Sequence, residues 1–416
     1  MNKTALGFAV AALLALPATP ALAARDAALL AAAEAAQPAL IESLKDMVAI
    51  ESGSQDAAGV ARMADYAEQR LKALGAAVER VPPSNGKGAI VKATLTGTGK
   101  RRFLLISHMD TVYPAGTLAQ QPWRIDGNKI YGPGIADDKG GVAVILHTLA
   151  LLKQAAWRDY AQLTVLLNAD EEIGSPGSGE LLATLGEQHD VVLSFEPPAA
   201  KAVARAEGVL LSAAGTATAV LEVKGRASHA GAAPDIGRNA LIELAHQILQ
   251  TQDIAKNIPG AQLNWTWSHA GAIRNQIPES ASATADVRLM QADSAAKLEA
   301  ALKARIAESK RVPDTEVSVR LVIGRPPYVA SERGRALALK AQAIYAELDG
   351  RTLALVPTTG GATDAGYAGR SGKPAVLESL GLAGWGYHAR DEYIEIDSIV
   401  PRLYLASRLL IELGRE

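Results

Sequence analysis

Residues 103–110 of the 416-residue chain read FLLISHMD, an apolar run that ends in a histidine and an aspartate. Two later stretches follow the same pattern with carboxylates, LTVLLNADEE at 163–172 and VVLSFEP at 191–197. Short apolar runs bounded by polar residues are typical of strands buried on both faces of a sheet. Ligands of an open parallel sheet bind outside the carboxyl ends of its strands, so these polar groups are predicted to converge on one site.

The wider pattern predicts an α/β fold. Strand candidates lie at 76–81, 89–96, 103–107, 163–167, 191–195 and 375–377, and helical patterns separate several of them, at 140–153, 178–185, 335–346 and 399–413. This alternation predicts a mostly parallel sheet covered by helices. Residues 216–323 instead read strand, helix, two strands, helix and strand. That βαββαβ order predicts a ferredoxin-like four-stranded antiparallel sheet with two helices on one face, inserted into the larger domain.

The predicted domains are a signal peptide at 1–23, a catalytic domain in two parts at 24–214 and 325–416, and an inserted lid or dimerisation domain at 215–324. The first segment carries one cation, Lys3, then an apolar run and Ala21-Leu22-Ala23, the layout of a cleavable secretory signal. Its apolar run is shorter than the ~20 residues of a membrane-spanning helix. We therefore expect a periplasmic or secreted protein that is not membrane-bound after cleavage.

Composition excludes several classes of function. The chain has no cysteine, which removes thiol nucleophiles, disulfide frameworks and zinc fingers, so any metal must be held by His, Asp and Glu. Lys and Arg number 42 against 44 Asp and Glu. This balance gives no basic excess for binding nucleic acid, which we do not expect as a partner.

The polar groups at the strand ends point to a metal site. Several carboxylates and two imidazoles would lie close together, and they would repel one another unless cations lay between them. Two ions would each receive one imidazole and one carboxylate, with a further carboxylate shared, from His108, Asp137, Glu172, Glu196 and His388. A pair of such ions can acidify a bridging water for attack on a carbonyl.

Spacing assigns two more acids. Residues i and i+2 at a strand end point the same way, so Asp110 can orient the imidazole of His108. Glu171 and Glu172 are adjacent and tend to point apart. One can hold metal while the other faces the substrate as a general base.

Taken in order, these segments resemble a known family. The segments SHMDTVY, GPGIADDKGG, NADEE, SFEP, GRASHAGAAP, NQIP, GGATDA and GYH are similar to those of metallopeptidase family M20, and most closely to its carboxypeptidase G branch, the glutamate carboxypeptidases. The likeness runs from about residue 30 to the C-terminus and includes the inserted domain.

The resemblance implies a zinc-exopeptidase catalytic domain with two zinc ions, for which Co²⁺ or Mn²⁺ can substitute. One ion would be held by His108, Asp137 and Glu196, and the other by Asp137, Glu172 and His388. Asp137 would bridge the ions, Glu171 would be the general base, and Asp110 would orient His108. His229 of the SHAG segment would reach the active site of a partner subunit and stabilise the oxyanion, so a homodimer through the lid domain is expected.

The resemblance also assigns the substrate's carboxylate to the inserted domain and its hinge. The implied binding residues are Asn275, Arg288, Arg325 at the return hinge, and Gly361 in a glycine-rich loop. A guanidinium fork and exposed backbone N–H groups suit this task.

We therefore expect a dizinc carboxypeptidase that releases a C-terminal acidic residue, glutamate, from small peptides or N-acyl conjugates such as folates. Alternatives within the family are an exo-hydrolase of oligo- or poly-aspartate and another N-acyl-amino-acid amidohydrolase. A different class, a periplasmic solute-binding protein that uses metal only to fold, would have no need of the free carboxylate at Glu171.

Overall fold

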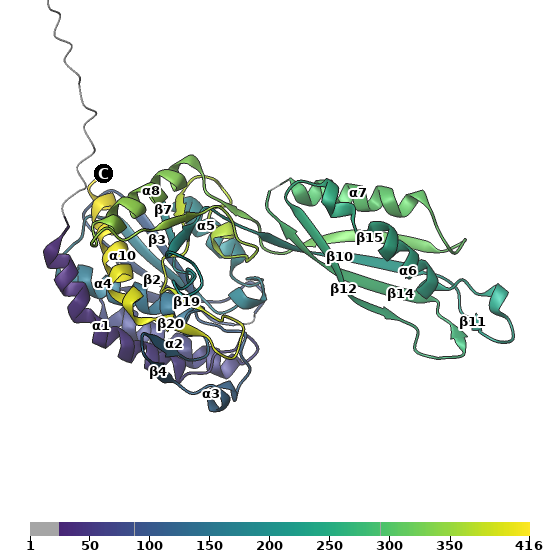
Figure 1. The fold of residues 1–416 in the computed structure, drawn as a ribbon, viewed down its shortest axis with the longest axis horizontal. Coiled ribbons are helices and arrows are strands. Elements are labelled where there is room, and N and C mark those ends of the chain that lie inside the picture. Colours follow the sequence, from purple (N-terminus) through teal and green to yellow (C-terminus); the bar gives the residue numbers. More distant parts are fainter. Residues whose placement is uncertain (1–24, 87, 292) are drawn as a thin grey trace, which may run out of the picture.

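The computed structural model describes residues 25–86, 88–291 and 293–416. The predicted signal peptide lies outside the described residues. Figure 1 shows a larger unit formed by the two ends of the described chain, and an elongated unit formed by its middle part. No helix within the described ranges combines the length and apolar character needed to cross a membrane.

A six-stranded sheet forms the centre of the larger unit. Its order is β1-β2-β6-β3-β7-β18, from β1 (Ala77–Val81), β2 (Ile90–Thr96), β6 (Gln162–Asn168), β3 (Arg102–His108), β7 (Val191–Ser194) and β18 (Ala375–Leu377). Strand β3 runs parallel to β6 and β7, and β18 runs parallel to β7. Strand β2 pairs antiparallel with both of its neighbours, β1 and β6. The predicted mostly parallel α/β sheet is confirmed.

Helices cover both faces of this sheet. Successive residues of a strand point to opposite faces, so alternate side chains of β3 pack into two different clusters. Phe103 and Leu105 pack into the cluster that contains α1 (Ala27–Val48), α2 (Ala57–Ala73), α4 (Lys139–Gln154), α8 (Glu332–Ala346) and α10 (Ile399–Gly414). Leu104 and Ile106 face the other cluster, with α5 (Gly179–Gln188) and α9 (Ala365–Ala368). Strand β3 is therefore buried on both faces, which explains its continuous apolar sequence.

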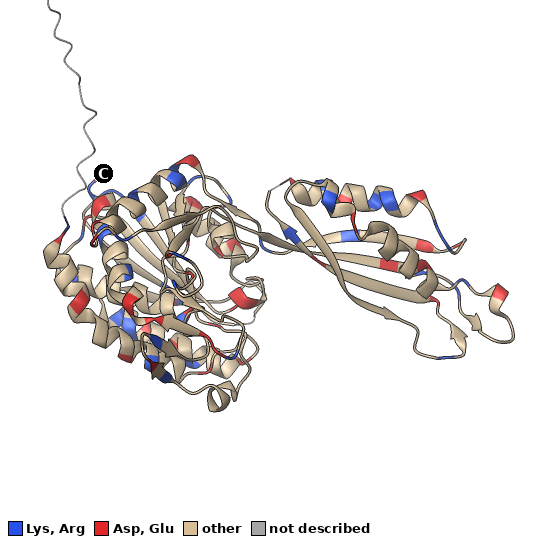
Figure 2. Ribbon diagram, in the orientation of Figure 1, with Lys and Arg blue, Asp and Glu red and all other residues tan. Residues whose placement is uncertain are grey.

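The elongated unit has the predicted βαββαβ order. Its elements are β10 (Gly215–Lys224), α6 (Ala240–Thr251), β12 (Ala261–Ala270), β14 (Ser280–Leu289), α7 (Ser294–Glu308) and β15 (Glu316–Ile323). The four strands pair antiparallel in the order β12-β14-β10-β15, and both helices pack on the same face of the sheet. Alternate residues of β14 are buried, as expected for a sheet covered on one side. Figure 2 shows basic and acidic residues on the helices of both units.

Smaller sheets connect distant parts of the chain. The strands β4 (Arg124–Asp126), β5 (Lys129–Tyr131), β19 (Gly384–Trp385) and β20 (Tyr393–Glu395) form a sheet in the order β19-β20-β5-β4. Two-stranded pairs join β8 (Gly208–Leu210) to β17 (Ala354–Val356), β9 (Ser212–Ala213) to β16 (Tyr328–Val329), and β11 (Ser228–His229) to β13 (Gln276–Ile277). The first of these sheets brings the loop before β20 next to the start of α4.

A buried ion pair joins α10 to the strands and provides a test of the fold. Arg402 is fully buried, and its Nε lies 2.9 Å from Oε2 of Glu207, which is 1 % exposed. Replacing Glu207 with Ala should lower the free energy of unfolding by about 3–5 kcal/mol, because the buried guanidinium would lose its counter-charge. Urea unfolding measures this change.

The matched control is the exposed pair of Glu180 and Arg370. Replacing Glu180 with Ala should cost about 1 kcal/mol or less, because water screens exposed charges. Equal losses in the two variants would contradict the role assigned to the buried pair.

Candidate active site

Five predicted metal ligands lie together at the carboxyl edge of the central sheet. His108 ends β3, Glu172 lies in the 3₁₀ turn η1 (Glu171–Ile173) that follows β6, and Glu196 follows β7. Asp137 precedes α4, and His388 lies between β19 and β20. Their ligand atoms form two groups within 4.8 Å, one of His108, Asp137 and Glu196 and the other of Asp137, Glu172 and His388.

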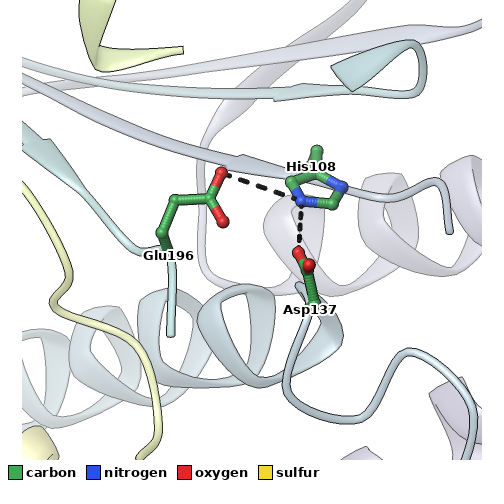
Figure 3. Close-up of side chains that lie close together, drawn as sticks. All are labelled: His108, Asp137 and Glu196. Carbon is green, nitrogen blue, oxygen red and sulfur yellow. Dashed lines mark hydrogen bonds and ion pairs between the residues drawn. The ribbon is translucent and has the colours of Figure 1, made fainter. Parts of the chain in front are cut away.

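Asp137 belongs to both groups, and each of its oxygens faces one imidazole. Its Oδ1 lies 3.0 Å from Nε2 of His108, and its Oδ2 lies 3.4 Å from Nε2 of His388. Glu196 approaches Nε2 of His108 at 3.8 Å, as Figure 3 shows. Glu172 approaches Nε2 of His388 at 3.0 Å. This geometry is that of one shared carboxylate between two imidazole–carboxylate pairs.

Burial and close contacts shift the pKa values of the groups in this cluster. Burial disfavours the charged imidazole of His108, but the contacts with Asp110 and Asp137 outweigh it and raise its pKa well above the usual value. Hydrogen bonding to Asp137 and Glu172 raises the pKa of His388 to about 10. Burial raises the pKa of Glu196 well above its usual range. Both shifts favour the charged form of the imidazoles when no metal ion is bound.

Asp110 fixes the orientation of two neighbours. It is fully buried, and its Oδ1 lies 3.3 Å from Nδ1 of His108. Its two oxygens also accept hydrogen bonds from the backbone N–H groups of Glu171 and Glu172, each at 3.2 Å. One carboxylate therefore positions an imidazole and the turn that carries both glutamates.

Glu171 lies beside the five groups but in neither of the two ligand sets. Its carboxylate is 2.6 Å from Nη1 of Arg325, and the same guanidinium donates to the carbonyl oxygens of Glu171 and Ala362. Asp364 lies 3.5 Å from Nε of Arg325. Burial raises the pKa of Glu171 to about 8, although Arg325 opposes this shift. Arg325 is itself buried, and its ion pair with Glu171 fixes the position of that carboxylate.

A cavity of about 670 Å³ opens over these groups. Its wall includes the predicted substrate-binding residues Arg288, Arg325 and Gly361. Arg288 lies near the end of β14, where its Nε bonds to Asp286 at 3.0 Å and its Nη1 lies 3.5 Å from the carbonyl of Gly360. The inserted unit therefore contributes a guanidinium to the cavity of its own chain.

The structure does not bring His229 or Asn275 into this cavity. His229 lies on β11, which Figure 1 places at the end of the elongated unit away from the larger unit. The backbone carbonyl of Asn275 accepts from the N–H of Ala230, beside that strand. Exposed His229 accepts from the backbone N–H groups of Gly231 and Ala232 through its Nδ1. Within one chain, both residues are separated from the five clustered groups.

Sequence reasoning missed Glu392, which supports Asp137. Its carboxylate is 1 % exposed and accepts from the backbone N–H groups of Gly134, Ala136 and Asp137, at 2.8, 2.8 and 2.9 Å. In the sequence, Glu392 is marked only by its place as an acidic residue directly before the short strand β20. Asp138 was also unassigned, although its side chain caps α4 at Gly141 and accepts from Ser107.

An α/β sheet with imidazoles and carboxylates clustered at the carboxyl ends of its strands defines a class of metal-dependent hydrolases. The family model "Peptidase family M20/M25/M40" matches residues 104–412. The chain belongs to this peptidase family, so it is a hydrolase of the metallopeptidase class, and the resemblance read from its motifs is confirmed. The solute-binding alternative is thereby set aside.

Individual relatives agree with this assignment. Carboxypeptidase G2 of Pseudomonas sp. (strain RS-16) is 46 % identical over 397 residues, which cover 94 % of this chain and 93 % of the relative. Succinyl-diaminopimelate desuccinylase of Gluconobacter oxydans is 28 % identical over 74 % of this chain and 81 % of its own length.

Two solved structures share the fold. Aminopeptidase PepT from Bacillus cereus has a TM-score of 0.72 at 21 % identity and covers 91 % of this chain and 99 % of its own. An M20 family metallo-carboxypeptidase from Sulfolobus solfataricus has a TM-score of 0.73 at 16 % identity, with the same coverage.

The clustered residues fit a pair of divalent cations. Imidazole nitrogens and carboxylate oxygens are ligands that Zn²⁺, Co²⁺ and Mn²⁺ accept. Three carboxylates and two imidazoles surround the space between the groups, and Asp110 orients one imidazole in the manner common around bound metals.

Metal uptake should release protons. The raised pKa values of His108 and His388, about 10 for the latter, favour protonated imidazoles in the metal-free protein, whereas a metal ion requires both to be neutral. We expect at least about two protons per chain to leave on loading with Zn²⁺, and apparent affinity to fall as pH falls. Calorimetric titrations in buffers of different ionisation enthalpy count these protons. Binding heats that do not depend on the buffer would contradict the expectation.

Proposed function

We propose that the protein is a dizinc carboxypeptidase that releases C-terminal glutamate from small peptides or N-acyl conjugates. The observation that carries the proposal is the Asp137 carboxylate between His108 and His388, with Glu171 beside it outside both ligand sets. The similarity to carboxypeptidase G2 over nearly the whole chain supports the carboxypeptidase reaction. The likeness of the sequence motifs to those of the glutamate carboxypeptidases supports the preference for an acidic residue.

His108, Asp137 and Glu196 would hold one zinc ion, and Asp137, Glu172 and His388 would hold the other. When bound, such ions supply Lewis-acid activation of water and of the scissile carbonyl. Their positive charge would also offset the repulsion among Asp137, Glu172 and Glu196.

Glu171 is proposed as the general base. Its side chain lines the cavity and is fixed by Arg325. Cations bound beside it would lower its raised pKa, so that its carboxylate could take a proton from water and pass it to the leaving amine. The contact with Arg325 would keep the carboxylate of Glu171 in one orientation at the cavity wall.

Arg288 and the backbone near Gly361 are proposed to receive the carboxylates of the released residue. The guanidinium of Arg325, which the motif resemblance assigned to the same task, already contacts Glu171, Asp364 and the carbonyl of Ala362, so its proposed role is to position Glu171. Arg288 borders the cavity with its Nη1 near the glycine-rich loop, and part of its guanidinium is free of the bond to Asp286. A planar fork and neighbouring N–H groups recognise a carboxylate better than an uncharged group. An aspartate-releasing enzyme is the alternative, and release of free Glu or Asp from matched N-acyl substrates distinguishes the two.

His229 and Asn275 are proposed to act on the active site of a second copy in a homodimer. Their position at the end of the inserted unit leaves them exposed and outside the cavity of their own chain. An imidazole supplied by a partner could stabilise the developing oxyanion. We also propose, from the sequence pattern of residues 1–23, that the protein is exported.

Replacing Glu171 with Gln tests the assignment of the base. The amide keeps the size of the side chain but takes no proton, so kcat should fall by at least about 100-fold. Zinc content, measured by atomic emission, should stay at the wild-type value because Glu171 belongs to neither ligand group. Turnover near the wild-type rate would contradict the assignment.

Mixing two inactive variants tests whether His229 acts between subunits. His229→Ala and Glu171→Gln chains, unfolded and refolded together, should recover up to about a quarter of wild-type activity, because half of the dimers are mixed and each holds one complete site. Each variant refolded alone is the control. Failure to recover activity while mixed dimers form would contradict action in trans.

A further inference from the structure

Asp364 is a buried carboxylate behind the active site, and the function proposed above gives it no role. It is 5 % exposed, and it lies outside both ligand groups and outside the residues that line the catalytic cavity. It directly precedes α9, where an aspartate side chain commonly caps a helix, but its carboxylate makes no cap hydrogen bond there. The cost of burying this charge must therefore be offset by other contacts.

The contacts of Asp364 come from three separate segments. Its Oδ2 accepts from Nδ2 of Asn168 at 2.7 Å, at the end of β6. Its Oδ1 accepts from the hydroxyl of Ser175, just after η1, and lies 3.5 Å from Nε of Arg325, at the return from the inserted unit. One carboxylate thus joins the end of a central strand, the turn that carries Glu171, and the hinge arginine.

The guanidinium of Arg325 has a neighbour at each of its three nitrogen atoms. Nη1 lies 2.6 Å from Oε1 of Glu171 and donates to the carbonyl of Ala362 at 2.7 Å. Nη2 donates to the backbone carbonyl of Glu171 and to the hydroxyl of Ser175. Nε forms no hydrogen bond within the described part of the chain, and it faces the carboxylate of Asp364. Asp364 therefore supplies a counter-charge on the side of the guanidinium that Glu171 does not occupy.

Two buried carboxylates share this one buried cation. Arg325 is 5 % exposed and Glu171 is 7 % exposed, so solvent and salt screen the attraction between them only weakly. The two carboxylates pull the guanidinium from different sides, and its Nη1 meets Glu171 at one oxygen. Without the charge of Asp364, the guanidinium would turn toward Glu171 and bind both of its oxygens, which is the arrangement that such pairs favour.

We infer that Asp364 is a positioning residue for the proposed base, because it holds Arg325 in the orientation that fixes the carboxylate of Glu171. The inference rests on the proposed function, since Asp364 acts through Glu171. A general base must lie within hydrogen-bond reach of the proton that it takes, and a displacement of about 1 Å can lower a rate about 100-fold. Asp364 lies outside the cavity, so it affects turnover rather than substrate binding.

Asp364→Asn tests this inference with N-benzoyl-glutamate as the substrate. The amide keeps the size of the side chain but removes the charge that faces Arg325. In the zinc-loaded variant kcat should fall about 10- to 100-fold. KM should stay within about threefold of the wild-type value because substrate contacts are unchanged. Zinc content should match the wild type, since Asp364 belongs to neither ligand group.

A double-mutant cycle distinguishes positioning of Glu171 from a general loss of structure. In chains that already carry Glu171→Gln, adding Asp364→Asn should change the residual kcat by less than about twofold, because the base on which Asp364 acts is gone.

The matched control is Glu243→Gln in the inserted unit. Glu243 is a fully buried carboxylate that accepts from the N–H groups of Arg311 and Val312, both at 2.7 Å. The substitution should lower thermal stability but leave kcat and KM at their wild-type values. If Asp364→Asn does not fold, Ser175→Ala takes its place, because it removes a hydroxyl that holds the carboxylate of Asp364. Its kcat should fall about fivefold, the equivalent of one hydrogen bond, with the same dependence on Glu171.

A folded, zinc-loaded Asp364→Asn chain with kcat within about twofold of the wild type would overturn the inference while leaving the proposed function intact. An equal loss in the presence and in the absence of Glu171, or a rise in KM at unchanged kcat, would also overturn it. If the wild type releases no glutamate, or if Glu171→Gln alone keeps full turnover, the proposed function falls and the inference falls with it.

Discussion

The site depends on one carboxylate, that of Asp137, facing two imidazoles at once. A second carboxylate makes this possible, because buried Glu392 accepts three backbone N–H groups from the segment that ends at Asp137. Glu392 directly precedes β20, and β20 pairs with β5. In the sequence, these two strands lie on opposite sides of the inserted unit. Two segments about 250 residues apart are thus joined where the ligands meet, which is why neither half of the larger unit can form the site alone.

Asp110 extends the same constraint to the other side of the site. It contacts His108, holds the backbone of Glu171 and Glu172, and accepts from the hydroxyl of Ser54 at 2.7 Å. Ser54 belongs to the loop between α1 and α2. The position of a proposed base, the orientation of a proposed ligand and the placement of this loop therefore depend on a single buried carboxylate, and displacement of one would disturb the others.

The strands and the metal ligands could be predicted from the sequence where a polar residue directly follows an apolar strand pattern. The strand predicted at 103–107 is β3 (Arg102–His108), and the five ligand candidates meet because parallel strands end at one edge. Glu392 could not be found in this way, since its partners are backbone N–H groups of a distant loop, and no side-chain pattern records such a contact. Likewise, nothing in the sequence around Arg325 indicates that its guanidinium contacts Glu171, because that contact forms only when the hinge packs against the turn after β6.

Because the inserted sheet is stiff, residues at its two ends cannot contribute to the same active site. Arg288 lies near the end of β14 that adjoins the cavity, whereas β13 and β11 lie beyond its other end, at Ser280. Nine strand intervals at about 3.3 Å each separate those ends by about 30 Å. A fully paired central strand cannot shorten, so no side-chain movement carries His229 to the cavity that Arg288 borders. Rotation of the rigid unit about its connections at Gly215 and Gly324 leaves His229 as far from them as before, and these connections adjoin the cavity. A catalytic contribution from His229 would therefore require a second copy of the chain.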